Sequence, residues 1–190
     1  NAAVVALYLA YDVSRMAVRN SEASQWGNTR NTVQRAIAGH RIQMLWDYVE
    51  SNPIGTGTGS WITTSEFAIP AIERLIGVGD PARVSWTDAT RLDLPDASLD
   101  AVLTDPPYYD SVCYSDLSDF QYVWLHRALG DILPAYFPSP LAPKQSEIIQ
   151  ETARHASDLE AKQFYEDKMR DALSEIRRVL KPDGIAMVMY

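Results

Sequence analysis

Two short acidic segments hold the residue types best suited to chemistry in this chain. The first is Asp105-Pro106-Pro107-Tyr108, which directly follows the apolar run 101–103. The prolines fix their φ angles and have no N–H group, so the segment is a stiff turn that is rich in acceptors. The tyrosine adds a flat aromatic face. Acceptors beside an aromatic ring suit a planar ligand with an exocyclic NH₂ group, such as adenine or cytosine.

The chemistry of such a site follows from the amine. Two acceptors bind both amine hydrogens and draw the nitrogen lone pair out of conjugation. A poor nucleophile then becomes competent toward an electrophilic methyl group. The pattern also fits a proline-rich turn that only ends a strand, and this reading stays open.

The second acidic segment is Thr87-Asp88, which ends the alternating run Arg83–Trp86. We expect a strand there and another at Leu99–Thr104, which is apolar enough to be buried in a parallel sheet. In open α/β sheets the ligand lies beyond the carboxyl ends of the strands, and both Asp88 and Asp105 fall at such ends. A plain turn role for Asp88 stays open.

A helix and a third strand complete this part of the chain. The spacing of apolar residues predicts a long amphipathic helix over 158–180, a turn at 181–184 and a strand over 185–190. Strands that alternate with helices are typical of an α/β sheet. Upstream and between these elements, the same spacing predicts helices over 2–20, 32–49, 65–76 and 117–129.

The sequence therefore divides into a helical segment, residues 1–79, and an α/β segment, residues 80–190. The glycine cluster Gly55–Gly59 superficially resembles a phosphate-binding loop, which should follow a strand and open a helix. Here a helix is expected before it, so we interpret it as a flexible loop.

Composition limits the function classes. The net charge of -8 disfavours a domain that grips nucleic acid mainly through phosphates, unless a local basic patch exists. The single cysteine, Cys113, rules out an intramolecular disulfide and a multi-cysteine zinc site, and we expect it to be a packed residue. We expect no metal site and no membrane association, and these features suit a reducing cytoplasm.

The motif and its surroundings resemble a known enzyme family. Asp-Pro-Pro-Tyr at a strand end is similar to the catalytic motif of S-adenosylmethionine-dependent amino-methyltransferases. The longer runs TDPPYYDSVCYSDLSDFQYVWLHRALGD and RRVLKPDGIAMVMY resemble the adenine-specific DNA methylases that carry an N-terminal domain of unknown function, as does RNTVQRAIAGHRIQMLWDYVESNP. The resemblance implies a partial Rossmann-like class I methyltransferase fold with an added helical N-terminal segment.

The resemblance also implies roles for particular residues. Asp105 and the Pro106 carbonyl would hold the target amine, with Pro107 completing the motif and Tyr108 stacking on the base. Asp88, together with Asp105, would lie on the S-adenosylmethionine side. Two further tyrosines, Tyr109 and Tyr114, would form walls or wedges of the pocket. The partner would be DNA, with the target base flipped out of the duplex.

Three functional readings remain open. The first is methylation of an exocyclic base amine, adenine N6 before cytosine N4; the second is methylation of an RNA base or a protein glutamine. The third is a non-catalytic module derived from a methyltransferase. The family's acidic, glycine-rich cofactor turn is not found in this sequence. We therefore expect a piece of a longer enzyme, which could form a homodimer through open sheet edges.

Overall fold

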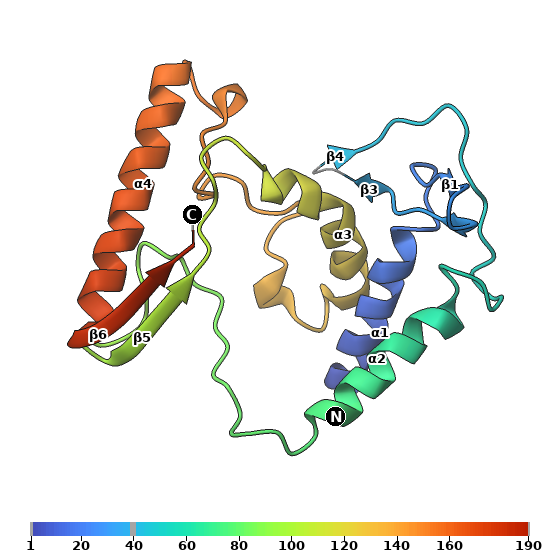
Figure 1. Cartoon of the computed structure of the whole chain (residues 1–190), viewed down its shortest axis with the longest axis horizontal. Helices are drawn as coiled ribbons and strands as arrows, with labels where there is room; N and C mark the ends of the chain where they lie inside the picture. Colours follow the sequence, from blue (N-terminus) through green and yellow to red (C-terminus); the bar gives the residue numbers. More distant parts are fainter. Residues whose placement is uncertain (1, 39–40, 190) are drawn as a thin grey trace. The chain divides into compact units, whose positions relative to one another are not determined.

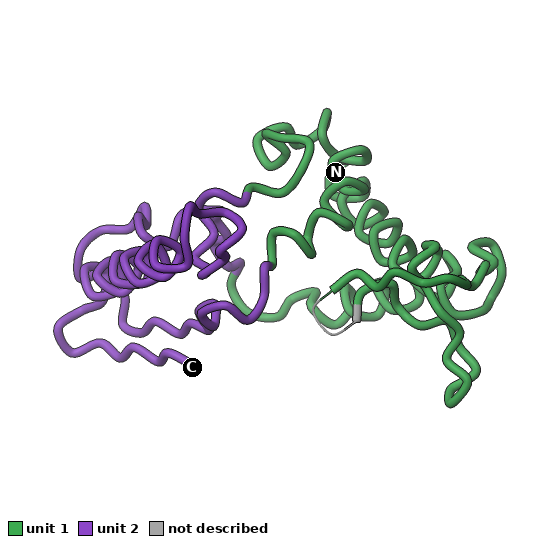
Figure 2. Tube along the Cα trace, turned by 90° about the horizontal axis from the view of Figure 1, so that it is seen from above, with its two compact units in different colours: residues 1–80, 114–143 green, residues 81–113, 144–190 purple. Residues whose placement is uncertain are grey.

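The computed structural model describes residues 2–38 and 41–189, which form two compact units (Figures 1 and 2). Unit 1 comprises residues 1–80 and 114–143, and unit 2 comprises residues 81–113 and 144–190. The first boundary lies close to the expected one between the helical and α/β segments. Residues 114–143, however, belong with the N-terminal segment.

Unit 1 is built on three helices: α1 (Ala2–Ala17), α2 (Trp61–Leu75) and α3 (Tyr114–Leu129). Helix α1 packs against both α2 and α3. Small buried residues of α1, Ala10 and Ala17, permit this close approach, and Leu129 of α3 is almost fully buried. Helix α2 begins where the Ser60 hydroxyl accepts the Thr63 N–H, which satisfies a backbone donor that the first turn leaves open.

The segment between α1 and α2 contains two short antiparallel ladders. Strand β1 (Trp26–Gly27) pairs with β2 (Thr32–Val33), and β3 (Ile37–Ala38) pairs with β4 (Arg41–Ile42). The predicted helix over 32–49 is therefore wrong.

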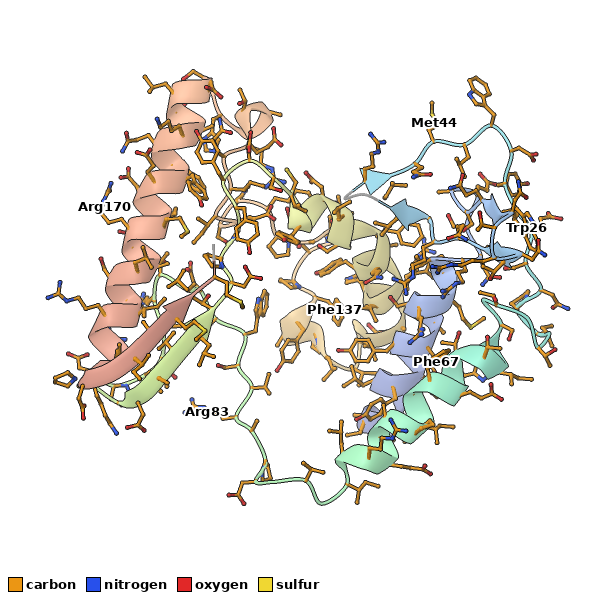
Figure 3. All side chains as sticks on the ribbon, in the orientation of Figure 1. Trp26, Met44, Phe67, Arg83, Phe137 and Arg170 are labelled. Atoms are coloured by element: carbon orange, nitrogen blue, oxygen red, sulfur yellow. The ribbon has the colours of Figure 1, made fainter. Side chains whose placement is uncertain are left out.

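The apolar residues that suggested this helix do not share a buried face. Val33 is buried, but Met44 is 90% exposed and projects away from the ribbon (Figure 3). The backbone is instead satisfied across chain segments, as where the Ala36 N–H donates to the Val18 carbonyl at 2.7 Å.

Unit 2 contains a parallel pair of strands, β5 (Leu99–Thr104) and β6 (Leu180–Val188), connected through helix α4 (Asp158–Val179) (Figure 1). Parallel neighbours require such a crossover, because a tight turn cannot return the chain in the same direction. The register sets Ala101 opposite Ile185 and Thr104 opposite Val188. The predicted turn at 181–184 is absorbed into β6 as an irregularity in this register.

The predicted strand over 83–86 is wrong. Residues 81–88 have no regular secondary structure and no strand partner among the described residues, and Val84 is 90% exposed. A strand needs a neighbour for its backbone groups, and alternation of side chains alone does not supply one. The other predicted helices and strands are confirmed, β5 with its predicted ends and the rest with shifted ends. The expectation that β5 is buried is wrong, since none of its residues is buried and Leu103 is 71% exposed. The protein is thus a mixture of helices and strands with small sheets.

The part of the chain that the structure describes has no helix of the length and apolar character needed to cross a membrane.

Candidate functional site

The turn that follows β5, residues 105–109, is held by several hydrogen bonds, and we call it the acceptor turn. The ladder continues to its start, where the Met189 N–H donates to the Thr104 carbonyl at 3.0 Å. The Tyr108 hydroxyl then donates to Asp105 Oδ1 at 2.6 Å. This short bond to a carboxylate fixes both side chains relative to the turn. Asp105 is exposed and Tyr108 is 43% exposed, so both can meet a ligand.

A tyrosine of α4 holds the acceptor turn from behind. The Tyr165 hydroxyl donates to the Pro107 carbonyl at 2.9 Å and accepts the Tyr109 N–H at 3.2 Å. Its side chain is only 5% exposed, so these bonds form away from bulk water. Tyr165 is the positioning residue that sequence reasoning missed. Its only sequence signal is a tyrosine at an inward position of an otherwise charged amphipathic helix.

Tyr109 takes part in the turn's architecture. Its φ is +47°, in the left-handed region that a bulky residue rarely adopts. The surroundings hold it there: its carbonyl accepts the Gln150 N–H at 3.0 Å, and its ring meets the Tyr165 ring edge-on at 5.2 Å. The structure therefore places Tyr109 against α4, where its ring supports the turn.

A cavity of about 310 Å³ lies between the acceptor turn and α4. Residues 102–107 form one wall, and apolar residues of α4, among them Met169 and Ile176, form another. Leu92 and Ala89 contribute from the preceding loop. An apolar cavity with a carboxylate and peptide carbonyls on one wall suits a flat ligand that carries hydrogen-bond donors.

Asp88 directly precedes Ala89, which lines this cavity, and its side chain accepts hydrogen bonds within its own turn. Its Oδ1 accepts both the N–H and the hydroxyl of Thr90 at 2.8 Å. These two bonds, the backbone bond most, hold the pKa of Asp88 below its usual value. The carboxylate stays charged at neutral pH, but its nearest described partner is its own loop.

The remaining candidates lie elsewhere. Tyr114 is the first residue of α3 and belongs to unit 1, so it is not part of the compact unit that carries the acceptor turn. Cys113 donates its thiol hydrogen to Glu151 Oε2 at 3.0 Å. That bond is the main reason why the pKa of Glu151 lies below its usual value. The structure thus brings Asp105, the two prolines, Tyr108 and Tyr109 together.

The described residues of unit 2 do not fit a complete S-adenosylmethionine site. No glycine-rich turn follows β5 there. The Gly55–Gly59 cluster lies in unit 1 and leads into α2, whose first turn the Ser60 side chain already caps. The helix expected before the cluster is not formed, and α2 does follow it, so the ground given for a plain loop is wrong. No strand directly precedes the cluster either, since β4 ends at Ile42. Within the described ranges, no group of three or more acidic, histidine or cysteine side chains is arranged to hold a metal ion.

Comparisons with known proteins give no relative: no family model, curated protein or solved structure matches the chain.

Proposed function

We propose that unit 2 carries the target-amine side of an S-adenosylmethionine-dependent methyltransferase that acts on an exocyclic base amine, with adenine N6 preferred. The observation that carries the proposal is the bond between Tyr108 and Asp105 at the end of a parallel strand. It holds a carboxylate and an aromatic ring in one rigid turn, which is what recognition of a flat aminated ring requires.

The hydrogen bonds of the turn indicate which of its acceptors are already used and which are available to the amine. The Pro107 carbonyl already accepts the buried Tyr165 hydroxyl, so its role is structural. The Asp105 carboxylate and the Pro106 carbonyl are then the acceptors that bind the amine. A negative group at this position also stabilises the positive charge that a nitrogen gains when it attacks an electrophile. Tyr108 provides the face on which the base stacks, worth about 1–3 kcal/mol.

The proposal covers the amine side and the local fold. The parallel β5–α4–β6 unit corresponds to part of a Rossmann-like class I methyltransferase sheet. The donor side needs elements that the described residues do not form, so no step of the reaction is assigned to them. DNA is the proposed partner, and the cytoplasm is the proposed location.

Binding of nucleosides tests the amine site without the methyl donor. We would titrate the chain with 2′-deoxyadenosine and follow tyrosine ring signals by NMR. The matched probes are purine deoxyriboside, which lacks the amine, and N6,N6-dimethyldeoxyadenosine, which lacks its hydrogens. Only deoxyadenosine should perturb Tyr108. Equal binding of all three would contradict the proposal, because the amine would then contribute nothing.

Two variants test whether deoxyadenosine binding depends on the acceptor turn. Asp105→Asn should weaken deoxyadenosine binding by about tenfold or more, since hydrogen bonds to charged groups contribute about 1.5–3 kcal/mol. Asp110→Asn is the matched control, because Asp110 is an exposed acid in the same loop. Deoxycytidine and a glutamine peptide, run in parallel, decide between adenine and the other amines. Loss of affinity in both variants alike would point to net charge as the cause.

A further inference from the structure

Unit 1 contains a cavity of about 450 Å³ beside the carboxyl end of α1, and three arginines line it. We call it the arginine pocket: Arg15, Arg19 and Arg35, with Tyr11, Ser14 and Gln121. All of these residues lie within unit 1. In a chain with a net charge of -8, three cations around one cavity need an explanation.

The fold brings these arginines together from separate segments. Arg15 lies in the last turn of α1, and Arg19 lies in the turn that follows it, where its N–H donates to the Met16 carbonyl at 2.9 Å. Arg35 follows β2, and its position is fixed by the next residue, because the Ala36 N–H donates to the Val18 carbonyl at 2.7 Å. Val18 and Ala36 are both buried, which makes this junction firm.

The three arginines of the arginine pocket form no ion pair in the described part of the chain. The nearest acid along α1, Asp12, is buried and accepts the Ser65 hydroxyl at 3.0 Å. Arg15 lies over the Phe67 ring at 4.6 Å, a contact that leaves the cation charged.

Arg19 shows the cost of this arrangement most directly. Its Nε is buried and has no hydrogen-bond partner among the described residues. Burial first, and then the charges of Arg35 and Arg15, lower the pKa of its guanidinium. The carbonyl end of α1 offers only a partial negative charge in compensation. A buried donor without a partner is unfavourable. The guanidinium of Arg19 therefore lies beside two like charges at the wall of the cavity, without an acid paired to it in the described ranges.

We propose that the arginine pocket binds the phosphate of a nucleotide or of a nucleic-acid strand. Guanidinium groups match phosphate oxygens with paired donors, and several of them around one cavity select a multivalent oxyanion. The cavity exceeds a bare phosphate in size and falls within the range of small-ligand pockets. Tyr11 offers a half-exposed ring and Gln121 an amide for the rest of the nucleotide. This site is independent of the proposed amine site.

Calorimetric titration of the whole chain with inorganic phosphate, deoxyadenosine 5′-monophosphate and a single-stranded oligodeoxynucleotide tests this inference. Arg35→Gln and Arg15→Gln alter exposed side chains and should fold. Each should weaken binding by about tenfold or more. Each should also lower the salt dependence of oligonucleotide binding by about one unit of log–log slope. Arg74→Gln, an exposed arginine near the end of α2 outside the cavity, is the matched control and should change neither quantity.

The outcomes distinguish a nucleic-acid strand from a free nucleotide, and both of these from a pocket that binds no phosphate. Tighter binding of the oligonucleotide identifies a strand, and tighter binding of the mononucleotide identifies a free nucleotide. No binding of any probe to a folded chain, or equal loss in Arg74→Gln, would overturn the inference. Plain deoxyadenosine distinguishes this site from the amine site, because it lacks the phosphate and should be insensitive to Arg35→Gln.

Discussion

The acceptor turn of unit 2 and the arginine pocket of unit 1 present opposite hydrogen-bonding chemistry. The turn offers a carboxylate and peptide carbonyls on a proline-stiffened backbone, and Tyr165 holds it through two hydrogen bonds. The pocket offers guanidinium donors, one of which is buried without a partner among the described residues. Hydrogen bonds within unit 2 hold the backbone of the first site, whereas a donor of the second has no partner among the described residues.

This difference shows that the net charge of the whole chain does not describe the local charge of either region. A value of -8 disfavours phosphate binding for the chain as a whole, yet three arginines gather around one cavity. Because charges interact over about a Debye length in physiological salt, the local arrangement decides what binds. The following predictions test whether the two regions behave as separate sites.

The largest expected effect comes from the core of unit 1. Leu129→Ala removes a side chain that is 1% exposed, so the free energy of unfolding of unit 1 should fall by about 2–5 kcal/mol. Urea denaturation and amide hydrogen exchange measure the loss. Leu141→Ala, at a half-exposed position of the same unit, is the control. Phosphate binding should suffer while deoxyadenosine binding persists; loss of both would show that the two sites are not separable.

A smaller effect is expected from the support of the acceptor turn. Tyr165→Phe deletes one hydroxyl that serves both Pro107 and Tyr109, and it leaves a partly buried carbonyl and N–H with fewer partners. We expect a loss of about 1–3 kcal/mol in the stability of unit 2, together with weaker deoxyadenosine binding. Tyr48→Phe, a half-exposed tyrosine of unit 1, is the comparison. Unchanged nucleoside binding in Tyr165→Phe would mean that the turn does not need this support.

The smallest effect concerns pH and the loop that carries Leu92. Arg178 donates to Glu175, to Asp96 and to the carbonyls of Leu92 and Leu94. Its bonds are the main reason why the pKa of Glu175 falls from 4.5 to about 2.

The sign of the pH effect follows from that direction. A carboxylate whose pKa is depressed in the folded state stabilises unit 2 above about pH 4.5, and this contribution is lost as pH falls through about 2. Arg178→Met should therefore flatten the decline of the melting temperature over this range. Arg177→Met, at the exposed neighbouring position, should keep the wild-type decline. If the melting temperature of Arg178→Met declines with pH as in the wild type, the decline comes from other carboxylates.

Two similar segments show what a local sequence pattern can and cannot predict. Thr87-Asp88 and Thr104-Asp105 each follow a run that reads as a strand. Only the second run is one, because β6 provides its parallel partner, while residues 81–88 have none among the described residues. The helix predicted over 32–49 failed for a related reason. Two short antiparallel ladders form instead, and the Ala36 N–H bonds to the distant Val18 carbonyl.

The amino-acid sequence by itself determined the long helices and the chemistry of the acceptor turn. Apolar periodicity sets the first, and the second needs only four adjacent residues, 105–108, whose prolines restrict the backbone. Tertiary structure decided what supports the turn and what forms the arginine pocket. Tyr165 lies more than fifty residues from Pro107, and Arg35 reaches Arg15 and Arg19 only because the chain returns to α1. Such contacts depend on packing between distant segments, which spacing along the chain does not encode.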